Sequence, residues 1–135
     1  GRPMTTFGTG EQTRDYVFVK DVARANFLAG TAELPPVGML DARAFNVGTG
    51  IETSVNALAA ALIEGAGRDT PIERAPARPG ELQRSALVID KAAEQLGWRP
   101  QVGLVDGLRE TFAFFAERHA RACGGSPTGG VGASA

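Results

Sequence analysis

Segments with the character of β-strands alternate along this sequence with segments of helical periodicity. Met4–Phe7 and residues 16–19 are rich in β-branched and aromatic side chains and are predicted as strands, with a polar turn between them. A helix is expected next, capped by Asp21 and stopped by the Pro35-Pro36 pair. A further strand and a further helix follow. This order predicts an α/β layered fold.

The second strand and helix surround a glycine turn. Residues 44–47 are expected as a buried strand, which residues 48–50 (GTG) end. Thr53 or Ser54 is then expected to cap a helix that Gly65 and Gly67 close. A dinucleotide-binding loop would occupy the same place, but its third glycine is lacking, since position 53 is threonine. The sequence therefore favours a structural turn.

The second half of the chain is predicted to hold two extended segments, a turn and two helices. They are, in order, an extended segment at residues 71–77, a turn at residues 78–81, a short strand at residues 86–89, a helix at Asp90–Leu96 that Gly97 ends, and the longest helix at Leu104–Ala122. The last helix has an apolar stripe, because Val105, Leu108, Phe112 and Phe115 follow one another at helical spacings. Such a stripe needs an apolar surface to cover.

Length and charge limit the domain organisation and the partners. The 135 residues suffice for one domain, predicted over residues 1–122, and the Gly-rich residues 123–135 are predicted as a disordered tail. The 14 Lys+Arg against 15 Asp+Glu lack the basic excess of a nucleic-acid-binding protein. No apolar run reaches the ~20 residues needed to cross a bilayer. We therefore expect neither a nucleic acid nor a membrane as partner.

The cysteine and histidine content speaks against a metal site. Cys123 is the single cysteine, so an internal disulfide and a zinc site are excluded, and a reducing, cytoplasmic compartment is expected. Cys123 has no neighbouring base and is given no nucleophilic role. His119 has no cysteine or carboxylate at metal-ligand spacing and is expected at the surface.

Tyr16 and Lys20 have the spacing of the catalytic tyrosine and lysine of short-chain dehydrogenases. That pair works across one helical turn of ~6 Å, whereas Val17 and Val19 favour an extended backbone in which four residues span ~13 Å. We therefore predict that this pair is not catalytic, and no other catalytic residue is assigned.

Arg14 and Arg78 lie in two polar turns, where each planar guanidinium group can bind a pyrophosphate or a carboxylate. Two such groups that converge from separate loops would neutralise the charge of a diphosphate. Glu81 shares the second turn, in which a Pro-Gly pair fixes the backbone. The residue types alone also allow a simpler interpretation, in which Arg14 forms a surface salt bridge with Asp15.

Four segments carry a resemblance to a known family. They are residues 7–22 (FGTGEQTRDYVFVKDV), 45–50 (FNVGTG), 75–81 (APARPGE) and 96–100 (LGWRP). In this order they resemble the C-terminal part of extended short-chain dehydrogenases/reductases, the NAD-dependent nucleotide-sugar epimerases and dehydratases, and most of all the UDP-sugar 4-epimerases. The resemblance implies the substrate-binding, C-terminal portion of a Rossmann-type α/β enzyme, with the N-terminal dinucleotide-binding part absent from this chain.

The resemblance implies a UDP-hexose as ligand and gives five residues a role. Arg14 and Arg78 would bind the pyrophosphate, and Glu81 would accept hydrogen bonds from the ribose hydroxyl groups. Phe7 would lie near the uracil. Asn46 would contact the nucleotide or, alternatively, only stabilise its own turn.

The resemblance also implies NAD as the cofactor, bound by the N-terminal part that carries the catalytic tyrosine and lysine. The chain alone is then expected to be inactive, and the whole enzyme to be a homodimer. Two alternatives stay open: a sibling activity, such as a nucleotide-sugar 4,6-dehydratase, decarboxylase or reductase, and a non-catalytic binding or assembly module. Lys20 replaces an acidic residue of the family, a change expected to alter only the surface.

Overall fold

The computed structural model describes residues 2–34, 36–39 and 41–122. These residues form a mixed fold of helices and strands, in agreement with the α/β prediction. The elements are β1 (Met4–Phe7), β2 (Thr13–Arg14), α1 (Val19–Thr31), β3 (Thr53–Ser54), α2 (Val55–Ala66), β4 (Ile72–Ala75), α3 (Asp90–Leu96) and α4 (Leu104–Ala122). The predicted tail, residues 123–135, lies outside the described residues.

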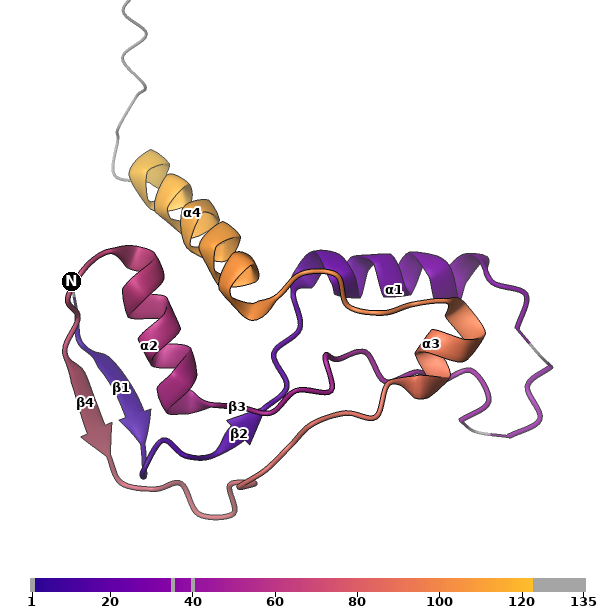
Figure 1. Ribbon diagram of the computed structural model, residues 1–135, viewed down its shortest axis with the longest axis horizontal. Helices are drawn as coiled ribbons and strands as arrows, with labels where there is room; N and C mark the ends of the chain where they lie inside the picture. The colour runs from indigo at the N-terminus through magenta and orange to yellow at the C-terminus, as the bar shows by residue number, and fades with distance from the viewer. Residues whose placement is uncertain (1, 35, 40, 123–135) are drawn as a thin grey trace, which may run out of the picture.

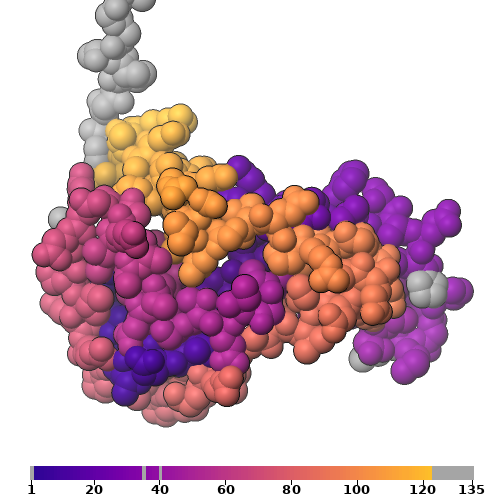
Figure 2. Space-filling view, in the orientation of Figure 1, coloured from indigo at the N-terminus to yellow at the C-terminus, as the bar shows by residue number. Residues whose placement is uncertain are grey.

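The molecule is elongated, and its two ends differ in structure (Figure 1). Strands β1 and β4 lie at one end with α2, and helices α1 and α3 lie at the other. The short strands β2 and β3 pair antiparallel between the two ends. Helix α4 packs on α2. The space-filling view shows the segment before α4 and the first turns of α4 over the middle of the molecule (Figure 2).

Strands β1 and β4 form a parallel pair, in which Phe7 lies opposite Ala75. The Gly8 N–H extends the pairing by a 2.9 Å hydrogen bond to the Ala75 carbonyl oxygen. Parallel strands need a long crossover connection, and α1 and α2 lie within this one. The pairing therefore brings the end of the first strand beside a segment that is distant in the sequence.

The apolar core lies between α1 and α3 and is built around Trp98. Its side chain is fully buried and packs with Ala25, Ala92 and Leu96. The small alanine side chains leave room for the indole between the two helices. The indole Nε1–H donates a 2.9 Å hydrogen bond to the backbone oxygen of Asp21, so this buried donor has a partner.

Asp21 does not cap α1, so that prediction is wrong. The helix begins two residues earlier, after an extended Phe18 that makes no side-chain cap. The buried Asp21 carboxylate instead accepts 2.9 Å hydrogen bonds from the backbone N–H groups of Gln101 and Val102. The Arg24 guanidinium donates a third bond of 3.0 Å. Because two of these donors lie just before α4, the carboxylate ties the start of α1 to the start of α4.

Three predicted strands are not formed. Residues 16–18 continue from β2 but lie outside the β2–β3 pair, and α1 begins directly after them. Residues 44–47 and 86–89 also lie outside the strand pairs of the described residues. A strand needs a neighbouring backbone. These two segments are joined by a side chain instead, since Asn46 Nδ2 donates a 3.1 Å hydrogen bond to the Val88 backbone oxygen.

The helix ends agree with the predictions where a cap or a glycine sets them. Ser54 caps α2, since its hydroxyl oxygen accepts a 3.1 Å hydrogen bond from the Ala57 N–H. Gly67 and Gly97 end α2 and α3 at φ values of 60° and 62°, in the left-handed region that favours glycine. The bounds of α3 and α4 are the predicted ones.

Three residues of the apolar stripe predicted on α4 are exposed in the structure, and the buried residue of this helix is a glycine. Val105 and Phe115 are each 61% exposed, and Phe112 is 41% exposed. The buried position is Gly107, where an added Cβ would lie 3.0 Å from the Phe18 ring. Close contact between α4 and the start of α1 therefore depends on the absence of a side chain, which a search for large apolar residues cannot detect.

We expect Asp21→Ala to lower the free energy of unfolding by about 1–3 kcal/mol, because buried N–H groups lose their acceptor. Urea unfolding followed by the fluorescence of Trp98, the single tryptophan, measures this change. Asp106→Ala is the control, since it removes an exposed ion pair with Arg109 and should leave the unfolding free energy nearly unchanged. Equal stability of the two variants would contradict the role of Asp21.

The same carboxylate should make stability depend on pH. Burial acts to raise the pKa of Asp21, but hydrogen bonds from Val102, Gln101 and Arg24 outweigh it, so this pKa lies below its ordinary value of 3.8. A lowered pKa in the folded state means that the ionised form stabilises the fold above about pH 4, and that this stabilisation is lost as the pH falls further. We expect the unfolding free energies of the wild type and Asp21→Ala to differ at neutral pH and to converge in acid. A constant difference across that range would refute the linkage.

Candidate functional site

Phe7 and Arg78 form the first pair of predicted site residues. Phe7 ends β1 and is half-buried, and Arg78 follows β4 on an exposed turn. The Arg78 Cζ lies 3.8 Å from the centroid of the Phe7 ring, so the guanidinium group stacks on the ring face. The parallel register explains the contact, because Ala75 lies opposite Phe7 and the chain turns back three residues later.

Arg14 and Glu81 form the second pair. The Arg14 Nη2 lies 3.4 Å from a Glu81 carboxylate oxygen, and both side chains are partly exposed. The Arg14 Nη1 donates hydrogen bonds to the backbone oxygens of Leu82, at 2.8 Å, and Thr13, at 2.6 Å. The alternative salt bridge with the neighbouring Asp15 is not formed, since that carboxylate has other partners.

Arg78 of the first pair and Glu81 of the second pair lie on the same turn. The Glu81 N–H donates a 3.3 Å hydrogen bond to the Arg78 backbone oxygen, and Gly80 in the turn has a φ of 75°. A side chain is strained at that φ, so glycine suits this place. The structure thus brings four of the five predicted residues to one region as two adjacent pairs. Arg78 is exposed, and the Arg14 side chain is 32% exposed.

Asn46 is the fifth predicted residue and lies elsewhere. It is exposed and donates to the Val88 backbone oxygen. This bond joins Asn46 to a distant segment and not to its own turn, and a contact with the nucleotide stays a prediction.

The Asp15 side chain binds the glycine turn at residues 48–50, although it comes from a distant part of the sequence. Its carboxylate accepts hydrogen bonds from the Thr49 N–H, at 2.7 Å, the Thr49 hydroxyl, at 2.6 Å, and the Gly50 N–H, at 2.9 Å. The Leu87 N–H adds a fourth bond of 3.2 Å. An added Cβ at Gly48 would lie 2.5 Å from the carboxylate, so the turn needs glycine there.

These hydrogen bonds give the turn a structural role, although the strand predicted before it is not formed. Its N–H groups, which in a dinucleotide-binding loop face a phosphate, face the Asp15 carboxylate instead. Burial acts to raise the pKa of Asp15, but the hydrogen bonds from Thr49, Gly50 and Leu87 outweigh it and hold the pKa below its ordinary value. The Asp15 carboxylate thus takes the position at this turn that a bound phosphate would have in a dinucleotide-binding loop.

Two residues that the sequence analysis did not identify hold the loop after Phe7. The Arg74 guanidinium donates to the backbone oxygens of Gly8 and Thr9. The Asn56 side chain donates a 3.0 Å hydrogen bond to the same Thr9 oxygen. The positive φ of Gly8, 63°, indicates a turn, but nothing in the sequence pattern gives the residues that bind it.

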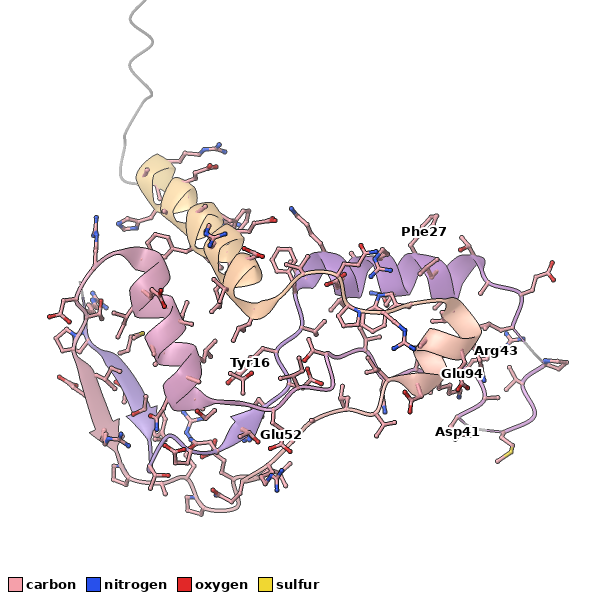
Figure 3. All side chains as sticks on the ribbon, in the orientation of Figure 1. Tyr16, Phe27, Asp41, Arg43, Glu52 and Glu94 are labelled. Atoms are coloured by element: carbon pink, nitrogen blue, oxygen red, sulfur yellow. The ribbon has the colours of Figure 1, made fainter. Side chains whose placement is uncertain are left out.

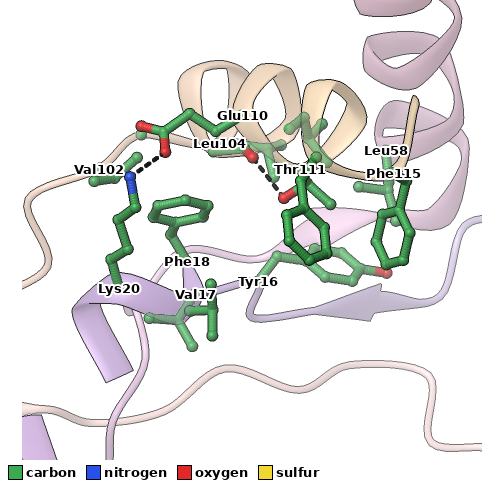
Figure 4. A pocket seen from close by; sticks show the side chains of 15 residues that line it. Tyr16, Val17, Phe18, Lys20, Leu58, Val102, Leu104, Glu110, Thr111 and Phe115 are labelled. Atoms are coloured by element: carbon green, nitrogen blue, oxygen red, sulfur yellow. Dashed lines mark hydrogen bonds and ion pairs between the residues drawn. The ribbon is translucent and has the colours of Figure 1, made fainter. Parts of the chain in front are cut away.

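An apolar cavity of about 700 Å³ lies between residues 16–20 and α4 (Figure 4). Its walls include Phe18 and Phe115, and an ion pair between Lys20 and Glu110 lies at one side. None of the five predicted site residues lines it. The cavity is therefore separate from the two arginine pairs.

Tyr16 lies in the extended segment between β2 and α1 (Figure 3) and lines this cavity and a second one of about 230 Å³. Lys20 lies in the first turn of α1, so the two residues do not share a helical turn, as predicted. The Lys20 side chain is 70% exposed, in agreement with a surface position.

His119 is exposed on α4, as predicted, and Cys123 lies outside the described residues. Among residues 2–34, 36–39 and 41–122, no three His, Cys, Asp or Glu side chains are grouped so that they could hold a metal ion. In the same part of the chain, no helix combines the length and apolar character of a membrane span.

The family model described as GDP-mannose 4,6 dehydratase matches residues 1–111. A UDP-glucose 4-epimerase of Mycolicibacterium smegmatis is 44% identical over 118 residues, which are 87% of this chain and 36% of the relative. The chain thus spans about a third of the length of this relative.

Solved structures agree with this relationship. A UDP-glucose 4-epimerase of Thermotoga maritima with UDP-glucose matches with a TM-score of 0.75 and 39% identity, over 87% of this chain and 36% of that one. A UDP-glucuronic acid 4-epimerase of Bacillus cereus, with UDP-glucuronic acid and NAD, matches with a TM-score of 0.76 and 27% identity, over 86% and 36%. The sequence match and the fold agree, and the chain belongs to the family of NAD-dependent epimerases and dehydratases that includes GDP-mannose 4,6 dehydratase.

Proposed function

We propose that this chain is the nucleotide-sugar-binding part of a UDP-sugar 4-epimerase. The observation that carries the proposal is the position of Arg78 and Glu81 on one turn, with Arg78 on the Phe7 ring and Glu81 beside Arg14. Relatives named as UDP-sugar 4-epimerases, two of them solved with a UDP-sugar, support a uridine nucleotide as the ligand.

Each pair supplies the chemistry that one part of a nucleotide needs. The guanidinium groups of Arg14 and Arg78 suit the pyrophosphate, because charge-assisted hydrogen bonds to phosphate oxygens are strong and directional. Glu81, which lies 3.4 Å from the Arg14 guanidinium, suits the ribose hydroxyl groups as an acceptor. Phe7, whose ring has Arg78 stacked on one face, would lie beside the uracil.

NAD is the cofactor named with several relatives, and it would accept and return a hydride in a 4-epimerisation. The glycine turn at residues 48–50 does not fit its pyrophosphate, because the Asp15 carboxylate occupies the N–H groups. We therefore assign this chain the binding and orientation of the nucleotide, and no step of the hydride chemistry. Homodimerisation of the whole protein and a cytoplasmic location stay predictions.

Replacement of Arg78 should weaken nucleotide binding. We expect Arg78→Ala to raise the dissociation constant for UDP about ten- to a hundredfold, because a charged hydrogen bond to phosphate is lost. Isothermal titration calorimetry measures the constant. Arg109→Ala is the matched control, since Arg109 is an exposed arginine on α4. Equal affinity of the two variants for UDP would contradict the pyrophosphate role and favour a non-catalytic assembly module.

The base should be recognised as well as the phosphates. We expect UDP-glucose to bind more tightly than dTDP-glucose or GDP-mannose, because the Phe7 site is assigned to a uracil. Titrations of the three compounds under one buffer give the ranking. A preference for GDP-mannose or dTDP-glucose would overturn the UDP assignment and favour a sibling activity, such as a 4,6-dehydratase.

A further inference from the structure

Gln12 is a buried polar side chain next to the proposed nucleotide site, with no part in the roles assigned so far. It is 5% exposed, although the preceding Glu11 is exposed. Burial of an amide is costly unless the amide is hydrogen-bonded. The Gln12 Nε2 donates a 3.0 Å hydrogen bond to the backbone oxygen of Phe7, and this bond closes the loop between the two residues.

The peptide group that joins Phe7 to Gly8 is bonded at both of its polar atoms. Its oxygen accepts from Gln12 Nε2 at 3.0 Å, and its N–H donates to the Ala75 oxygen at 2.9 Å. Because a peptide group is planar, two opposed bonds fix the orientation of the whole plane. The backbone at Phe7, from which the ring projects, is therefore held from two sides.

Gln12 itself is held by the surrounding chain. Its backbone oxygen accepts a 3.1 Å hydrogen bond from the Val55 N–H at the start of α2. The next residue, Thr13, donates a 2.8 Å bond to the Gln83 oxygen, just after the turn that carries Arg78 and Glu81. The Gln12 amide thus starts from a fixed backbone, which makes it a rigid support for the Phe7 peptide.

The ring in turn orients Arg78. This arginine lies on an exposed turn, and its guanidinium carbon is 3.8 Å from the centroid of the Phe7 ring. A stacked guanidinium loses rotational freedom, which lowers the entropic cost of placing it on a phosphate. Any shift of the Phe7 peptide would therefore change the position of a phosphate-binding group.

We propose that Gln12 is a positioning residue for nucleotide recognition, which holds the Phe7 peptide and thereby sets the Phe7 ring and the Arg78 guanidinium. Its effect on affinity rests on the proposed function of Arg78, whereas its effect on geometry does not. Gln12 does not contact the ligand in this account. It acts through Phe7.

The first experiment is made on the free full chain and needs no ligand. The face of the Phe7 ring should shift the NMR signals of the Arg78 side-chain methylene protons upfield of those of an exposed arginine, with Arg78→Lys used for assignment. We expect Gln12→Met to move these signals toward the exposed position, as Phe7→Ala does. Gln101→Met is the control, since that side chain is exposed. An Arg78 signal unchanged by Gln12→Met would overturn the proposal.

The second experiment measures UDP affinity by calorimetry. We expect Gln12→Met to raise the dissociation constant about two- to tenfold, the worth of one hydrogen bond. In the Phe7→Ala background the same change should have no further effect, because Gln12 acts through that ring. Two fully additive losses would contradict the proposal.

Failure of the proposed function and failure of the role of Gln12 give different results. Wild-type protein that fails to bind UDP would refute the proposed function, while the Arg78 signals of the free protein would still decide the role of Gln12. If Gln12→Met does not fold, Gln12→Asn takes its place, since this variant keeps the amide but is one methylene too short to reach the Phe7 oxygen. It should displace the Arg78 signals as well, and unchanged signals would overturn the proposal.

Discussion

The parallel pairing of β1 with β4 determines where the candidate site lies. It places Phe7 opposite Ala75, so the chain after β4 passes close to the end of β1, with Ala77 beside Gly8. The turn that follows supplies Arg78 to the Phe7 ring and Glu81 to Arg14. Parallel strands cannot be joined by a tight turn, and the long connection between β1 and β4 also holds Asp15, α1 and the glycine turn.

Two carboxylates hold that connection in place, and both do so by accepting backbone hydrogen bonds. Asp21 binds the N–H groups just before α4, and Asp15 binds those of the glycine turn and of Leu87. Both have lowered pKa values because these bonds outweigh the effect of burial. Asp15 and Asp21 thus accept backbone hydrogen bonds from segments that have no neighbouring strand to accept them.

Local signals in the sequence were sufficient for several helix ends, but not for the start of α1 or for the strand pairing. Ser54, Gly67 and Gly97 act through their own backbone, so the residue type alone indicates the cap or the stop. Strands at residues 44–47 and 86–89 were predicted from composition, yet a strand depends on a partner that composition does not reveal. The burial of Gly107 and the hydrogen bond of Gln12 were missed for the same reason, since both depend on contacts between distant segments. The resemblance to a known family supplied the roles of Arg14, Arg78 and Glu81, which residue type left open.

The map of NMR chemical-shift changes that UDP-glucose causes in the full chain tests the central claim most directly. We expect the largest changes at the side-chain N–H groups of Arg14 and Arg78 and in the Phe7 ring. Smaller changes are expected along the turn to Glu81, and the cavity beside Tyr16 and α4 should be little affected. Changes confined to that cavity, or no changes at a saturating concentration of UDP-glucose, would contradict this claim.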